Sequence, residues 1–71
     1  MNDASFDDVT SLRARLGELR IEHRDLDEAI SRLIHAPIED ELVLRRLKKR
    51  KLALKDRIEA IERIVDADEL A

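Results

Sequence analysis

The fold of this chain is decided by the stretch LRRLKKRKLALKDRI, residues 44–58. It holds seven Lys or Arg residues between positions 45 and 55, with no acidic residue among them, and we call these seven the basic band. Apolar residues recur through the same stretch at the three- and four-residue spacing of a heptad repeat, which only Lys51 interrupts. One face of a helix must therefore pack against a partner while the rest of its surface is basic.

A second heptad row fills the first half of the chain, and only His23 is polar in it. The two rows predict an all-α fold, a two-helix antiparallel coiled-coil hairpin, because they match each other when the chain is folded back on itself. The predicted apolar seam is Val9, Leu12, Leu16, Leu19, Leu26, Ile30, Leu33, Leu44, Leu47, Leu54, Ile58, Ile61 and Val65.

The two helices are expected to be separated by a turn near Pro37, because proline disfavours a continuous helix through this position. We predict a single domain over residues 1–71, with helix one at about 6–35, the turn at about 35–38, helix two at about 38–67, and frayed termini. Pro37 is expected to be the first residue of helix two, where its missing N–H is tolerated.

The antiparallel match also predicts which polar groups face each other. His23 and Lys51 should oppose one another in a polar layer that sets the register of the seam. Attractive pairs are expected beside the seam for Asp27 with Lys48, Glu22 with Arg50 and Arg13 with Glu62. Repulsive pairs are expected for Arg20 with Lys55 and Arg15 with Arg57.

Assembly into a larger helical bundle is predicted from chain length and from apolar residues outside the seam. Below about 70–80 residues a single core rarely contributes more than roughly 3–5 kcal/mol without disulfides, metal or oligomerisation, and this chain has no Cys. The apolar residues outside the seam are Ile21, Leu42, Val43, Leu52 and Ile64. We therefore expect a homo-oligomer, a dimer or higher.

No membrane association is expected, because no apolar run approaches the roughly 18 residues of a membrane span. The first ten residues, MNDASFDDVT, lack the basic and apolar regions of a signal peptide. A cytoplasmic location is therefore the expectation.

Several residues of the two rows carry a family resemblance. Glu22, His23, Leu26, Asp27 and Ile30, followed by LKKRKLALKDRI at residues 47–58, resemble the YdcH-like family of small bacterial proteins of unknown function. The resemblance implies a short helical hairpin in the bacterial cytoplasm, with no catalytic residues to carry over.

Metal binding and catalysis are not expected. His23 and Asp27 lie one helical turn apart, but His35 is more than three turns away and Lys51 is predicted to face His23. The acids at 39–41 are expected to complement the dipole of helix two instead of binding a cation. Neither a Gly-rich phosphate loop nor a nucleophile with a nearby base is present, so the chain is predicted to be no enzyme and to need no cofactor.

The basic band leaves two functions open. The preferred prediction is a protein-interaction or adaptor module that oligomerises and meets a partner protein. The alternative is a nucleic-acid-associated protein, although the band surrounds the helix and aromatic residues for base stacking are lacking. The residues predicted to contact a polyanion or partner are Arg45, Arg46, Lys48, Lys49, Arg50 and Lys55.

Overall fold

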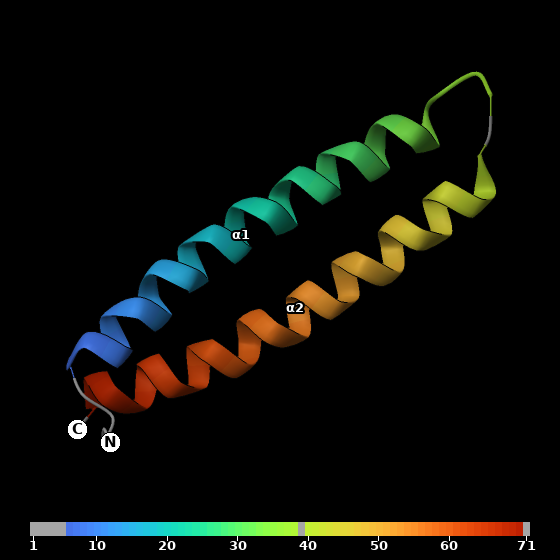
Figure 1. Ribbon diagram of the computed structural model, residues 1–71. Helices are drawn as coiled ribbons and strands as arrows, with labels where there is room; N and C mark the ends of the chain where they lie inside the picture. The colour runs from blue at the N-terminus through green and yellow to red at the C-terminus, as the bar shows by residue number, and fades with distance from the viewer. Residues whose placement is uncertain (1–5, 39, 71) are drawn as a thin grey trace.

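The computed structural model describes residues 6–38 and 40–70 and consists of two long helices. α1 spans Phe6–Ile34 and α2 spans Glu41–Leu70, and no strand is found in these ranges. The helices lie side by side and run in opposite directions, which forms a rod of 52 × 17 × 17 Å (Figure 1). This arrangement confirms the predicted all-α helical hairpin. We call the end with the interhelical loop the loop end, and the other end the open end.

Both helices are built on the heptad rows, which place one apolar side chain in the seam at every turn or nearly so. The buried side chains are Leu16, Leu19, Ile30, Leu54, Ile61 and Val65. Leu12, Leu26 and Ile58 are partly buried against them. The other four predicted seam residues are also partly buried, namely Val9, Leu33, Leu44 and Leu47.

The core is not evenly distributed along the rod. Five of the six buried side chains form one cluster toward the open end, and Ile30 lies outside that cluster. In the seam, His23 of α1 lies between Leu19 of the cluster and Ile30, and Lys51 of α2 lies between Leu54 and Leu47. The polar residues therefore lie where the well-packed half of the hairpin ends.

The start of α2 corrects one prediction. The helix begins at Glu41 and not near Ile38, and Pro37 is not its first residue. Asp40 caps this helix, because its Oδ1 accepts the N–H of Val43 at 3.1 Å and its carbonyl accepts the N–H of Leu44 at 3.0 Å. An Asp at this position satisfies an N–H that the first turn leaves unpaired, which Pro37 cannot do.

The other helix boundaries differ less from the sequence expectation. α1 ends at Ile34, and the ring of His35 contacts the carbonyl oxygen of Ser31 with its Nδ1 at 2.7 Å. α2 continues to Leu70, three residues beyond the expected end. Residues 1–5 and 71 and the expected dipole contact of Glu39 lie outside the described residues, whereas residues 68–70, for which the sequence predicts fraying, are helical. Among the described helices, neither is long and apolar enough to cross a membrane.

Candidate interaction surface

The two polar seam residues line one shallow depression beside the seam. Lys51 is partly buried, and its Nζ lies 2.5 Å from Oδ1 of Asp27 on the opposite helix. His23 lines the same depression, and its Nε2 is buried without a hydrogen-bond partner. The structure therefore brings His23 and Lys51 into one place, but the ammonium of Lys51 contacts Asp27.

This contact changes the acidity of Asp27. The hydrogen bond from Lys51 holds the pKa of the Asp27 carboxyl below its usual value, and the charges of Lys51 and His23 act in the same direction. Partial loss of solvent around the carboxylate opposes this shift and does not reverse it. Asp27 therefore stays ionised at acidic pH values at which an isolated Asp begins to take up a proton.

One of the three predicted attractive ion pairs between the helices is present in the structure. Arg50 Nη2 lies 2.9 Å from Glu22 Oε1, as the sequence predicts. Asp27, in contrast, pairs with Lys51 and not with Lys48.

The arginines of α1 also find other partners than those predicted. Arg13 contacts Asp68 and Glu69 at 3.5 Å each and not Glu62. Arg20 contacts Glu62 at 2.7 Å, so the predicted repulsion from Lys55 is offset by a nearby carboxylate. Side chains lean toward the N-terminus of their own helix. Because the two helices are antiparallel, a residue of α1 on this flank meets a residue of α2 further along the chain than its direct neighbour.

The second predicted repulsion lies on the other flank of the seam. Arg15 and Arg57 line one open depression, whose apolar part is formed by Leu19, Ala53 and Leu54. Arg15 pairs with Glu18 of its own helix at 3.5 Å. For Arg57 no ion pair is found with any described residue, so its positive charge is not balanced within the hairpin.

Most of the basic band is free of intramolecular ion pairs. Arg50 and Lys51 are paired across the seam with Glu22 and Asp27. The remaining members are exposed and form no ion pair within the described ranges, and they are Arg45, Arg46, Lys48, Lys49 and Lys55. Of the six predicted contact residues, all but Arg50 therefore have a cationic group available for a partner.

The charges of α2 are divided between its two halves. Residues 45–55 hold the basic band, whereas residues 56–69 hold six acids and two arginines. The acids are Asp56, Glu59, Glu62, Asp66, Asp68 and Glu69. Since α2 runs the length of the rod (Figure 1), its basic half lies toward the loop end and its acidic half toward the open end.

Large apolar side chains are exposed mainly on α2. Leu52 is 61% exposed, Ile64 51% and Val43 36%. The exposed large apolar residues of the described chain are Ile21, Ile34, Ile38, Leu42, Val43, Leu52, Ile64 and Leu70. Five of these belong to α2 and two to α1, so a partner that covers apolar surface would cover more of it on α2.

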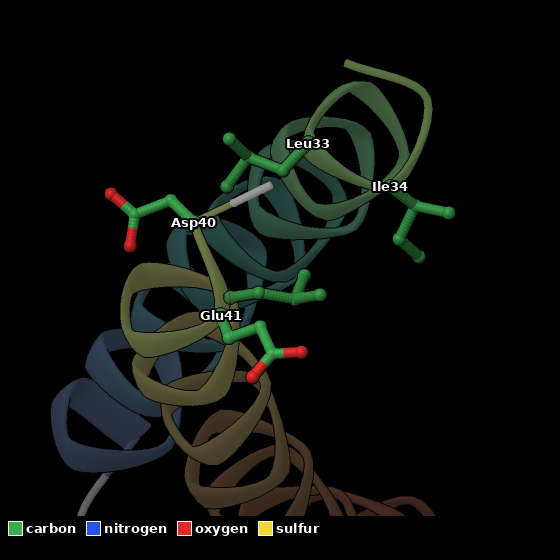
Figure 2. Close-up of a pocket in the computed structure, with 5 residues that line it drawn as sticks. Leu33, Ile34, Asp40 and Glu41 are labelled. Atoms are coloured by element: carbon green, nitrogen blue, oxygen red, sulfur yellow. The ribbon is translucent and has the colours of Figure 1, made fainter. Parts of the chain in front are cut away.

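A small pocket lies at the loop end, where α1 ends and α2 begins. It is lined by Leu33, Ile34, Asp40, Glu41 and Leu44 (Figure 2). Figure 2 shows Leu33 and Ile34 diverging from the end of α1, while the carboxylates of Asp40 and Glu41 point to opposite sides. The pocket has no converging polar groups that would hold a substrate, because Asp40 is engaged in capping α2.

The residues that were considered as metal ligands from their spacing in the sequence do not form a metal site. His35 contacts Ser31, and Asp27 pairs with Lys51. Within residues 6–38 and 40–70, no group of three or more His, Cys, Asp or Glu side chains is arranged to hold a metal ion.

Comparison with known proteins gives one match. No curated protein matches the chain, and no solved structure matches it. Residues 16–62 match the family described as "Protein of unknown function (DUF465)", and this segment runs from the buried cluster of α1 through the loop to the middle of the acidic half of α2. The match confirms the resemblance carried by Glu22, His23, Asp27 and residues 47–58. Because it covers more than half of the chain, this protein belongs to the DUF465 family of proteins of unknown function, which includes the small YdcH-like proteins.

Proposed function

We propose that this protein is a non-catalytic helical hairpin that self-associates and serves as a protein-interaction or adaptor module. The observation that carries the proposal is the surface of α2, which combines exposed large apolar side chains with cations that form no ion pair with any residue the structure describes. Surfaces of this composition are typical of helices that meet another protein. In line with the family resemblance, we place this role in the bacterial cytoplasm.

The small core supports self-association. Among residues 8–38 and 40–70 only six side chains are buried, and the cluster that five of them form occupies one half of the rod. Fully burying an aliphatic side chain contributes about 1.5–3 kcal/mol, which the conformational entropy of ordering two helices largely offsets. Contact with further helices would add buried area that a single hairpin lacks.

Sedimentation equilibrium over a micromolar concentration range tests the proposal. We expect a dimer or larger species, together with a melting temperature that rises with protein concentration. A species of 8.2 kDa at every concentration would contradict self-association.

The nucleic-acid alternative is kept because five cations of the basic band are free of ion pairs. It ranks second because these residues do not share one stripe. Lys48 is on the same side of α2 as Lys55, seven residues later. Lys49 follows Lys48 by one residue, which turns it about 100° around the helix. Phosphate groups of one duplex would reach only part of the band, and the acidic half of α2 would repel the rest of the duplex.

A further inference from the structure

The outer face of α2 carries two neighbouring rows of residues at seven-residue spacing. One row consists of Arg46, Ala53, Ala60 and Ala67, which are all exposed. The second row consists of Val43, Arg50, Arg57 and Ile64. We call these two rows together the α2 outer face. All eight residues are exposed in the hairpin, although Arg50 of the second row pairs with Glu22 of α1.

The two rows differ in size, and this difference suits packing against an identical helix. From residue 53 onward the first row has only methyl groups, and the second row has long or branched side chains. When two such faces meet in antiparallel orientation with Ala53 of one helix opposite Ala60 of the other, the methyl groups face each other, which allows close approach. In parallel orientation the basic half of one helix would lie against the basic half of the other, with like charges side by side.

Charge selects the same orientation. The basic band at residues 45–55 and the acids at 56–69 occupy opposite halves of α2. An antiparallel second copy therefore brings acids alongside the basic band at both ends of the contact. Asp56, Glu59 and Asp66 form no ion pair within the described hairpin, so they are available to the cations of a second copy, as Arg45, Arg46 and Lys49 are to its acids.

We propose that a second copy of this chain packs antiparallel on the α2 outer face, with the basic half of each α2 against the acidic half of the other. The occupant is a second copy because one helix contains both halves of the complementary charge pattern. This inference rests on the proposed self-association and specifies its geometry. In this arrangement the Arg57 guanidinium, which forms no ion pair within the described hairpin, lies beside the acids of the second copy.

Cysteine cross-linking tests the geometry, since the chain has no Cys of its own. Arg46 and Ala67 are separated by 21 residues of α2, or about 30 Å along the helix. Antiparallel packing places residue 46 of one copy near residue 67 of the other. We therefore expect Arg46→Cys mixed with Ala67→Cys to give a mixed disulfide dimer under oxidation, while each variant alone gives little. Ala14→Cys, on the exposed side of α1, mixed with Arg46→Cys is the matched control and should not cross-link.

The outcomes separate this inference from the proposed function. Efficient self-cross-linking of each single variant would show parallel packing and overturn the inference. A dimer in sedimentation without the mixed cross-link would also overturn the inference, but it would leave self-association standing. A monomer in sedimentation would overturn both.

A substitution provides a second readout. Ala60→Arg places a guanidinium in the middle of the α2 outer face, and Ala14→Arg places the same group on the outer surface of α1. We expect Ala60→Arg to weaken the dimer by about tenfold or more, because the added cation faces the basic half of the second copy, and Ala14→Arg to change it little. Circular dichroism checks that both variants stay helical. Equal effects of the two substitutions on dimerisation would overturn the inference.

Discussion

The ammonium of Lys51 on α2 lies 2.5 Å from the carboxylate of Asp27 on α1. Lys51 interrupts the apolar seam, and this contact shows how the hairpin accommodates it. The lysine stem remains partly buried while its charge leaves the seam and meets an acid on the flank. Two helices that the heptad rows hold together thus share an ion pair at the boundary of the buried cluster.

This ion pair predicts how stability depends on pH. The Asp27 pKa is lowered in the folded hairpin, whereas in the unfolded chain it returns to about 3.9. The folded state then binds fewer protons than the unfolded state, so the contribution of Asp27 is fully present above the unfolded pKa and is lost as the pH falls through the folded pKa.

Urea unfolding between pH 2 and 6 measures this dependence. We expect Asp27→Asn to lower stability at pH 6 and to match the wild type at the acidic end. Asp25→Asn is the control, since Asp25 is exposed and forms no ion pair in the described structure. A difference between wild type and Asp27→Asn that stays constant with pH would contradict the prediction.

His23→Leu is predicted to stabilise the hairpin. The buried Nε2 of His23 has no hydrogen-bond partner, and an unsatisfied buried polar atom costs about 1–3 kcal/mol. A leucine at this position also continues the seam between Leu19 and Leu26. We expect a gain of about 1 kcal/mol or more, which raises the melting temperature by about 4–8 °C for a domain of this size. A loss of stability would instead identify His23 as part of a favourable polar network.

Gly17→Ala is also predicted to stabilise the hairpin, for a different reason. Gly17 lies within α1 at a negative φ, and a Cβ built there meets nothing within 4 Å. Alanine therefore adds helix propensity of about 1 kcal/mol without a clash. Ala14→Gly, in the same helix, should lose about the same amount. Thermal unfolding followed by circular dichroism measures both changes, and a destabilising Gly17→Ala would reveal that another molecule approaches α1 closely at this point.

The nucleic-acid alternative makes a separate prediction. We expect binding of the wild type to a short DNA duplex to be weak at low salt and absent at about 150 mM salt, because few phosphates are reached and added salt weakens the contacts that remain. The informative variant changes Arg45, Lys48 and Lys49 together to Gln.

Its control removes three cations elsewhere, with Gln replacing Arg24, Arg32 and Arg63, which are exposed and form no ion pair in the described chain. Fluorescence anisotropy measures binding of all three proteins. Binding at about 150 mM salt that only the first triple variant abolishes would favour the nucleic-acid role over the protein-interaction role.

The sequence by itself determined the two helices, the seam and the family. Regular spacing such as Leu12, Leu16 and Leu19 leaves only one face of a helix to bury, and that constraint is local. Pro37 likewise determined that a single helix could not run through the chain. The specific order of residues 47–58 was enough for the family resemblance.

Only the tertiary structure decided where α2 begins and which charges meet. Asp40 and Pro37 are both suitable at a helix start, and the hydrogen bond from Val43 to Asp40 selects the later one. Arg13, Arg20 and Asp27 each have several opposite charges within reach of a flexible side chain, so sequence spacing could not choose among them. The choice depends on how the leaning side chains of two antiparallel helices are placed relative to each other, and that placement exists only once the helices are packed.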